Sequence, residues 1–457
     1  MNKGSHTRKD PNAFGERLKE KLTKYTGKKL SSGLTLQGWR FDLHDIKLLE
    51  VGLKNSKLGG PYTAPSVKDV TEGEIFLIWR DTTSDPMYTS GKIDISTLEE
   101  FEDYIELWAK TAYCDRYGVD LVEPYDPPAV PLAQEAAERI VEGDFSYPFA
   151  LLKKGQEFLE QEYGVKKVDG RVQIAVDRRL VVNSKNLWIA YKQTPVELFL
   201  EGEDIFGDSF GEKRLPTEDE YDSLLRYTGE TISQLRNQVE FEGEKEMYIF
   251  LPPKVFAAFL DHYLLPNLSG GLVANRQSAF SKEDFLEQKR LFRSDLSIKV
   301  DGTREYRYSS YRCTGEGVST GEVEYIKEGK LITPILNLKY AKRMKMHPTP
   351  VPVGGAQGLI IGSKPRKSVD EIYQSLDEAL VVHSILGLHT QDYASGKFSL
   401  TADQCLLVKE GGIRGKTQTV IAGDFLHSLN REDSIFIHYP PDETPAYCFK
   451  AYVSRGR

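Results

Sequence analysis

The sequence predicts an α+β protein, with an N-terminal α/β domain followed by a mainly β, barrel-like C-terminal domain. At 457 residues the chain is too long for one small core. Its first half alternates helical apolar periodicity with strand-like runs. Its second half is dominated by strand-like runs joined by glycine-containing turns such as Glu328-Gly329 and Ser395-Gly396. We predict domains over 1–212 and 213–457, with the boundary near Lys213.

Helices are predicted where apolar residues recur at helical spacing, over 14–25, 132–141, 148–163, 217–240 and 252–265. A further long helix is expected to begin at Ser96, because Glu99 follows three residues later in a capping-box pattern. Apolar residues between positions 101 and 109 then keep the spacing of one buried face.

Strands in the first half are predicted over 34–43, 46–53, 74–79, 172–182 and 187–200. Asp169-Gly170 before an alternating apolar run predicts a hairpin turn, and Asn183-Ser184 predicts a second turn. Strands in the second half are predicted over 247–251, 295–300, 321–328, 358–362, 380–388, 397–408 and 418–421.

The composition restricts the class of protein. A formal net charge of −8 argues against a general nucleic-acid binder. No apolar run approaches ~18 residues, so no membrane span is expected. Residues 1–11 are polar, which predicts a disordered tail and no secretory signal. The four cysteines are widely spaced and form no CxxC pair, which is typical of reduced thiols, so we expect a soluble cytoplasmic protein.

The sequence lacks the common catalytic motifs. It contains no P-loop, no GxGxxG after a strand and no GxSxG, and none of its eight histidines is followed by glutamate. His383, His389 and Asp392 are the densest group of potential metal ligands, and an unbroken strand would place the two histidines on one face. Ordinary hydrogen-bonded histidines are the alternative. The acidic stretch 201–204 is either a solvated loop or a divalent-ion site.

Three stretches of the chain resemble one known family. The first contains Asp169-Gly170, Asn183-Ser184 and Glu201-Gly202, and the second contains Gly315-Glu316-Gly317 and the segment 325–331. The third is the most specific, with residues 387–392, 395–399, 412 and 421–424. Together they resemble the TldD/PmbA (modulator of DNA gyrase) metallopeptidase family, on its PmbA/TldE-like side. Asp424 stands where the family pattern usually has asparagine.

The resemblance implies that the catalytic motif of the family is missing here. Active members carry HExxxH on a helix, with a downstream cysteine as a further zinc ligand. In this chain Asp261 stands at the first histidine, His262 at the glutamate and Pro266 at the second histidine. No cysteine lies between positions 424 and 445. We therefore expect no zinc in this chain, and His262 is either a remnant ligand or a histidine at the edge of the core.

The resemblance implies a non-catalytic subunit that pairs with a zinc-bearing TldD-like protease and helps to bind unfolded peptide as an added strand. Neither nucleic acid nor membrane is an expected partner. The residues expected to contact peptide or partner lie in one loop and turn: Gly387, His389, Thr390, Gln391, Asp392, Ser395 and Gly396. A purely structural turn is the alternative for this segment. The alternatives for the whole chain are a self-standing homodimeric peptide-binding or assembly protein, and an active metallopeptidase using His262, His383 or His389.

Overall fold

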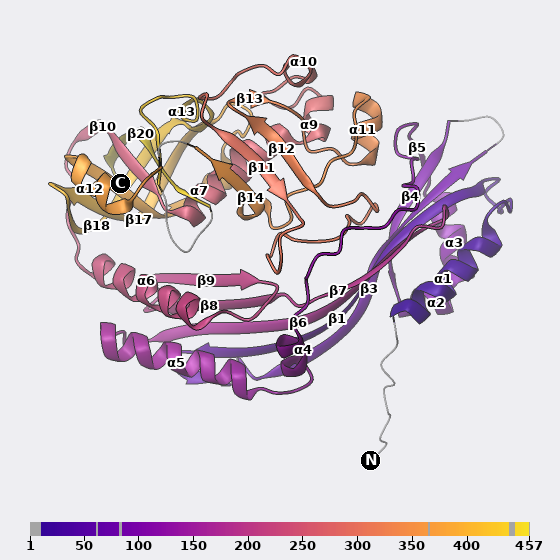
Figure 1. Cartoon of the computed structure of the whole chain (residues 1–457), viewed down its shortest axis with the longest axis horizontal. Coiled ribbons are helices and arrows are strands. Elements are labelled where there is room, and N and C mark those ends of the chain that lie inside the picture. Colours follow the sequence, from indigo (N-terminus) through magenta and orange to yellow (C-terminus); the bar gives the residue numbers. More distant parts are fainter. Residues whose placement is uncertain (1–10, 61–62, 82–84, 364–365, 438–443, 457) are drawn as a thin grey trace.

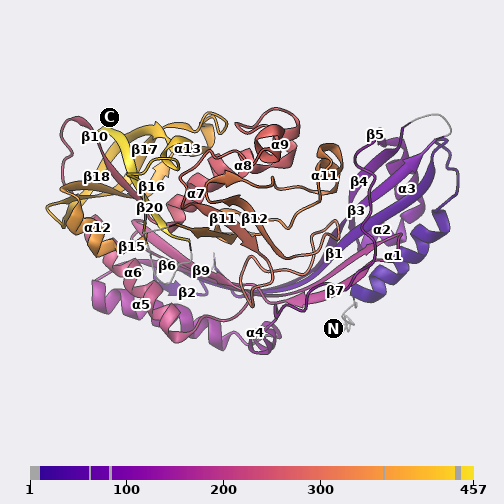
Figure 2. The same cartoon turned by 45° about the horizontal axis from the view of Figure 1, so that its top comes forward.

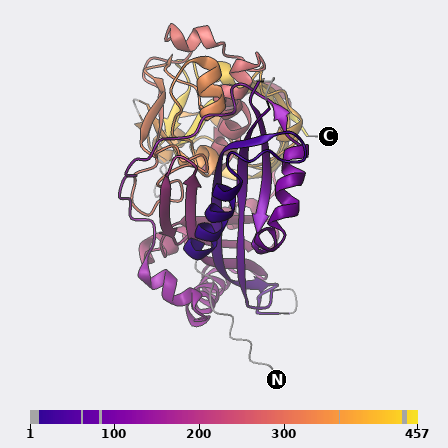
Figure 3. The ribbon, with the colours of Figure 1, turned by 90° about the vertical axis from the view of Figure 1, so that its right-hand side faces the viewer.

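The computed structural model describes residues 11–60, 63–81, 85–363, 366–437 and 444–456. The N-terminal half forms one long curved sheet, and the C-terminal half lies over one of its faces (Figure 1). Figures 2 and 3 show the same stacking from two other directions. The predicted tail over 1–11 falls, except for Pro11, outside the described residues. The mixed α+β class is confirmed.

The N-terminal sheet has nine strands, in the order β5-β4-β3-β1-β6-β8-β9, with β2 paired to β1 and β7 paired to β6. Their bounds are β1 (Thr35–Lys54), β2 (Lys57–Leu58), β3 (Ser66–Arg80), β4 (Met87–Asp94), β5 (Tyr113–Cys114), β6 (Val168–Asn183), β7 (Trp188–Gln193), β8 (Val196–Gly202) and β9 (Phe206–Glu212). Strand β9 therefore forms one edge of this sheet.

Three details of the predicted strand pattern are wrong, and one of them is that the run expected over 187–200 is two strands, β7 and β8, interrupted at Thr194-Pro195. The two strands expected over 34–53 are one 20-residue strand, β1, because its polar middle is paired on both sides. There Asp45 lies opposite Arg178 of β6, and the Asp45 Oδ2 atom is 3.3 Å from Nη1 of Arg178. Asp169-Gly170 is no turn but lies inside β6, where Gly170 pairs with Leu200 of β8. The turn at Asn183 is confirmed, since its side-chain oxygen accepts a hydrogen bond from the Lys185 N–H at 2.9 Å.

Helices cover the face of the sheet that points away from the C-terminal half. They are α1 (Pro11–Tyr25), α2 (Ile95–Glu99), α3 (Phe101–Lys110), α4 (Glu135–Val141), α5 (Ser146–Tyr163) and α6 (Glu218–Arg236). The long helix expected from Ser96 is two helices, because the backbone breaks at Glu100, and its N-cap is Asp94. Helix α6 begins at Thr217, whose hydroxyl and the Glu220 carboxylate form a capping box.

The C-terminal half contains a closed five-stranded barrel, as the sequence predicts. Strands β10, β16, β17, β18 and β20 pair in that order, and β10 pairs with β20 to close the ring. The strands of this half are β10 (Glu244–Leu251), β11 (Ser297–Asp301), β12 (Glu322–Lys327), β13 (Lys330–Leu331), β14 (Leu359–Gly362), β15 (Arg366–Lys367), β16 (Glu378–Leu386), β17 (Lys397–Lys409), β18 (Gly412–Asp424), β19 (Ile435–Ile437) and β20 (Ala446–Arg455). Strands β11 to β14 form a separate small sheet.

Short helices connect these strands. They are α7 (Pro253–Phe259), α8 (Leu265–Leu268), α9 (Gly270–Ala274), α10 (Lys282–Leu286), α11 (Leu338–Met344), α12 (Val369–Ser375) and α13 (Phe425–Ser428), with a π-helical turn over Leu260–Leu264 and 3-10 turns over Gly355–Gly358 and Leu388–Thr390. Helix α7 buries Phe256 and Phe259 against Phe425, and Tyr447 of β20 stacks on Phe256. This aromatic packing fixes α7 between the barrel and the N-terminal sheet.

No helix within the described residues is long and apolar enough to cross a membrane. Helix α6 packs Tyr221, Leu225 and Ile232 onto the N-terminal sheet. The division of the chain into domains at residue 213 stays a prediction.

Candidate functional site

A cleft of about 610 Å³ separates the edge of the N-terminal sheet from the C-terminal half. Strands β8 and β9 form its floor, and Pro253, Lys254, Asp261, Arg304, Tyr308 and Gly354 are among the residues on the opposite wall. A second cavity of about 330 Å³ adjoins it and shares Phe199, Pro253 and Lys254 with it. The two cavities therefore form one groove along β9.

Strand register defines the floor of the cleft. Arg171 of β6 pairs with Phe199 of β8, and Phe199 pairs with Ser209 of β9, so these side chains form one row across the sheet. The rows on either side end at β9 in Gly207 and Gly211. Because every second residue of a strand points to the same face, all five positions face the cleft. The edge of the floor is thus formed by small residues, with Phe199 behind them.

The outer edge of β9 points toward the groove. Glu212 forms an antiparallel bridge with Arg307, and the Lys213 N–H donates to the Tyr306 carbonyl at 2.7 Å. Backbone groups of alternate residues point the same way in an antiparallel ladder. The N–H and C=O groups of Gly211, Ser209 and Gly207 therefore point outward from the sheet. Residues 306–307 thus pair with the end of β9 as an added strand would, but in the ranges that the structure describes this pairing does not continue along β9.

Lys254 lies across this edge. Its ammonium forms an ion pair with Asp208 and donates to the Ser209 hydroxyl at 2.9 Å. Because adjacent strand residues point to opposite faces, a group that contacts both side chains must lie at the edge of the strand. The Lys254 ammonium therefore occupies the position that the backbone of an added strand would take.

The segment that resembles the zinc-motif helix is distorted. Leu260–Leu264 is a π-helical turn in which the Leu265 N–H donates to the Leu260 carbonyl. Proline has no N–H, and its ring clashes with the carbonyl four residues earlier, so Pro266 explains the widened turn. Asp261 points into the cleft, where its carboxylate accepts a hydrogen bond from the Ala356 N–H at 2.7 Å.

The other predicted site residues lie in a loop that packs on this same helix. His262 Nε2 is 3.0 Å from the Gln391 carbonyl, the Tyr263 hydroxyl donates to the Lys397 carbonyl at 3.2 Å, and the Asn267 amide donates to the Tyr393 carbonyl at 2.8 Å. The structure thus brings together two sets of residues, 261–266 and 387–396, that are far apart in sequence.

Within the loop, most side chains remain available to solvent. His389, Thr390, Asp392 and Ser395 are exposed, Gly387 and Gln391 are half-buried, and Gly396 is buried. Gly387 and Gly396 have φ angles of 90° and 71°, which glycine adopts without strain. The Gln391 side chain accepts from the Ser399 N–H at 3.1 Å and braces the loop against β17. Whether these residues contact peptide or partner stays a prediction.

His383 and His389 do not share a face. Strand β16 ends at Leu386 and has register shifts around Ser384, and His389 lies in the following 3-10 turn. His383 instead lines the second cavity, with its ring 5.4 Å from that of Phe206. Burial there lowers the pKa of His383 to about 4.

The residues at the motif position do not fit a zinc ion. The Gln391 carbonyl occupies Nε2 of His262, Pro266 has no donor atom, and Cys448 is buried in an apolar cluster with Phe250, so among the described residues no set of three ligands meets at this position. In the described part of the chain, just one group of three potential ligands comes together, Asp169, Glu201 and Asp204. Lys54 and Lys167 pair with Asp169 and Asp204, so this group already has cationic partners.

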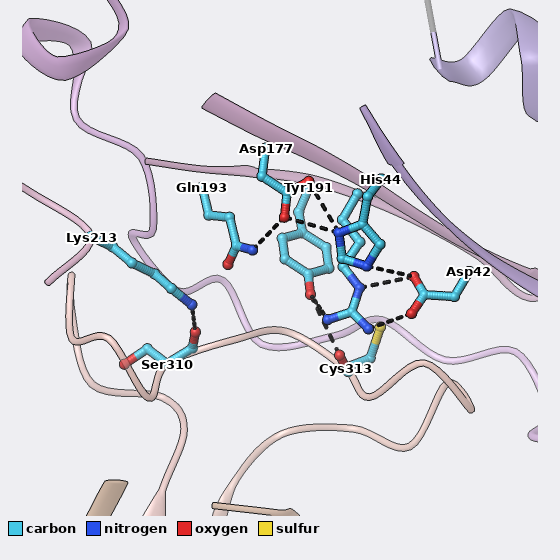
Figure 4. A network of polar contacts seen from close by, with 9 residues as sticks. Asp42, His44, Asp177, Tyr191, Gln193, Lys213, Ser310 and Cys313 are labelled. Carbon is cyan, nitrogen blue, oxygen red and sulfur yellow. Dashed lines mark hydrogen bonds and ion pairs between the residues drawn. The ribbon is translucent and has the colours of Figure 1, made fainter. Parts of the chain in front are cut away.

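A buried polar network connects the N-terminal sheet to the C-terminal half (Figure 4). Its members are Asp42, His44, Asp177, Arg179, Tyr191, Gln193, Lys213, Ser310 and Cys313. Arg179 donates to both Asp42 carboxylate oxygens, at 2.9 and 2.5 Å. The Lys213 ammonium donates to the Ser310 carbonyl across the boundary between the two halves. This network was not predicted, because its members are spread over 272 positions of the chain and only the strand register aligns them.

The charged groups of the network shift each other's pKa values. Burial disfavours the charged forms of Asp42 and His44. Hydrogen bonds that Asp42 accepts from Arg179 and His44 nevertheless lower its pKa to about 2. Hydrogen bonds that His44 donates to Asp177 and Asp42 raise the pKa of His44 to about 9. Burial lowers the pKa of Lys213 to about 7. The network lies beside the cleft and contributes to holding the two halves in register.

Other proteins of known structure share this fold. Residues 244–437 match the family model of the PmbA/TldA metallopeptidase C-terminal domain. The fold resembles that of TldE from Thermococcus kodakarensis, with a TM-score of 0.77 and 16% identity over 97% of this chain and 100% of that one. A proposed modulator of a DNA gyrase from Thermotoga maritima gives a TM-score of 0.73 and 18% identity, again over 97% of this chain and 100% of the other.

A further proposed gyrase modulator, from Bacteroides thetaiotaomicron, gives a TM-score of 0.72 at 16% identity over 98% of this chain and 100% of that one. An uncharacterized protein of Methanocaldococcus jannaschii is 27% identical over 168 residues, which span 36% of this chain and 40% of that protein. The match over residues 244–437 and the shared fold agree with the family that the sequence motifs predict.

Proposed function

We propose that the chain is a non-catalytic, PmbA/TldE-like subunit that binds unfolded peptide and presents it to a zinc-bearing TldD-like protease. The observation that carries this proposal is the outward-pointing edge of β9, which faces the groove at Gly207, Ser209 and Gly211. A peptide added to this edge would gain backbone hydrogen bonds that depend little on its sequence. We place the complex in the cytoplasm, as the sequence predicts.

The residues that stand in place of the HExxxH motif support a non-catalytic role. Asp261 and His262 hold neighbouring backbone instead of standing free, and Pro266 carries no ligand. Without a metal to lower the pKa of a bound water, this segment has no nucleophile of the metallopeptidase kind. A partner subunit would have to supply the metal and the general base.

Hydrogen exchange tests the binding surface directly. Outward-pointing amides of Gly207, Ser209 and Gly211 should exchange faster in the free chain than the β8-paired amides of Asp208 and Phe210. Saturating unstructured peptide should slow the first set and leave the second unchanged. Equal rates for the first set with and without peptide, under conditions where the peptide is bound, would contradict strand addition at β9.

The partner is tested by mixing the chain with a TldD-like protein from the same genome and measuring the mass of the complex by light scattering. A one-to-one heterodimer that cleaves unfolded peptide supports the proposal. A stable homodimer that ignores the second protein would support the alternative, a self-standing peptide-binding or assembly protein.

A further inference from the structure

We propose that the cleft selects extended peptides that carry a bulky apolar side chain, which packs between Phe199 and Tyr308. This inference rests on the proposed function, because it assigns a side-chain preference to the same groove. Both residues line the cleft, and each is 36% exposed, although large apolar rings are usually buried. An exposed aromatic pair in a cleft is typical of a binding surface.

Phe199 forms the back of the proposed slot. Its ring lies against Gly207, where a Cβ atom would be 2.8 Å from two ring carbons. Ser209 is its cross-strand neighbour on β9, so no large side chain stands between the Phe199 ring and the edge of the sheet. The floor itself is therefore low at this row, and the Lys254 ammonium on the Ser209 hydroxyl covers its outer edge until an added strand displaces it.

Tyr308 forms one end of the slot. Its hydroxyl donates to a Glu197 carboxylate oxygen at 3.3 Å, and its ring lies against Gly354, where a Cβ atom would be 2.9 Å from Cδ1. A Cβ at Gly211 would be 3.8 Å from the same ring. Tyr308 thus lies above the row formed by Glu197 and Gly211. This row is adjacent to the row formed by Phe199 and Ser209.

Strand spacing explains why a bulky side chain is favoured. Neighbouring strands lie about 4.8 Å apart, so an added strand would run about 10 Å from β8, with β9 between them. The Phe199 ring already extends over Gly207 of β9, but an alanine side chain on the added strand would leave the space above Ser209, between the two rings, unfilled. A phenylalanine or leucine side chain can extend over the small Ser209 position and contact both rings.

The test measures the affinity of fluorescently labelled host peptides, rich in serine and threonine, that carry Phe, Leu or Ala at one central position. Wild-type protein is expected to bind the Phe and Leu peptides about 10-fold more tightly than the Ala peptide. F199A should remove most of this preference, measured as the ratio of the Phe-peptide affinity to the Ala-peptide affinity in the same variant. Y308A, on the opposite side of the slot, provides a second variant.

The matched control is L286A, which removes a 61%-exposed side chain on α10 that does not line the cleft. It should leave the preference unchanged, and circular dichroism checks that each variant is folded. Equal affinities for the three peptides, or a preference that survives in both F199A and Y308A, would overturn the inference while leaving strand addition intact. Binding of no peptide would overturn the proposed function and the inference together.

Discussion

The Nε2 atom of His262 lies 3.0 Å from the carbonyl oxygen of Gln391, so that the residue at the position of the family's general base holds a loop of the barrel in place. His262 also packs edge-on against Tyr263, with 4.6 Å between ring centroids. Both contacts indicate a positioning role for His262 in this chain, in which the imidazole fixes the segment 387–396 beside the cleft.

Replacing His262 with alanine is expected to loosen that loop. The lost hydrogen bond is worth about 1 kcal/mol, so exchange of amides in 388–396 and cleavage there by an added protease should increase about 5-fold. H389A is the matched control, since His389 is exposed in the same loop. Equal effects of both variants on loop exchange would contradict a positioning role for His262.

Gly355 is expected to tolerate no side chain, because of Asp261. Its φ is 67°, and a Cβ atom would be 2.5 Å from the Asp261 Oδ1. Gly27 has a φ of 81° with nothing within 4 Å of a Cβ, so G27A measures the backbone strain alone, about 1 kcal/mol. G355A should cost at least about 1 kcal/mol more in urea unfolding. A similar loss in both variants would show that Asp261 does not pack closely on this loop.

The stability of the protein should depend on the protonation of His44. Its folded-state pKa is about 9 and the ordinary value is 6.5, so its contribution is fully present below pH 6.5 and is lost as the pH rises through 9. This contribution is at most about 3 kcal/mol. The pKa of Lys213 is lowered to about 7, so above that pH its titration makes stability rise with pH, opposite to the effect of His44. The pH dependence of the wild type alone therefore does not isolate the contribution of His44.

The measurement is therefore the difference in unfolding free energy between wild type and H44Q from pH 6 to pH 9.5. The difference should be largest near pH 6 and shrink toward pH 9.5. Asp42, with a folded-state pKa of about 2, adds stability that is lost only as the pH falls from about 4 through 2, outside this window. A difference that does not change with pH would contradict a protonated His44 between Asp42 and Asp177.

Removal of the Lys254 side chain should improve peptide binding. Surface ion pairs are worth about 0.2–1 kcal/mol. The pair with Asp208 is partly exposed, at 43% for Lys254 and 13% for Asp208, and a peptide strand would have to displace it, so K254A should bind unstructured peptide about 2- to 5-fold more tightly. K245A is the control: Lys245 has the same 43% exposure and pairs with Glu378, away from the cleft. Unchanged or weaker binding by K254A would place the peptide elsewhere.

Features that depend on neighbouring residues could be predicted from the sequence. Predictions failed where pairing with distant strands determines the conformation of the backbone. The barrel strands and the start of α6 at Thr217 follow from apolar alternation and a capping box, which are local signals. Asp169-Gly170 is a strong turn signal taken alone, but pairing on both sides keeps it in β6.

For the site, motif resemblance located Asp261, His262 and the loop 387–396, but it gave no sign that His262 contacts this loop. The outward edge of β9 and the slot at Phe199 were not predicted. Phe199 alternates in the sequence like any strand residue, and only the register with Arg171 and Ser209 places it on the floor of a cleft.

The proposed function depends on the absence of a catalytic zinc site from this chain. Its most direct test is the zinc content of the purified full-length chain, measured together with its cleavage of an unfolded peptide with and without a chelator. We predict less than about 0.1 zinc per chain and no chelator-sensitive cleavage until a TldD-like partner is added, because the motif segment offers no free ligand set. Stoichiometric zinc with chelator-sensitive cleavage by the chain alone would contradict the account.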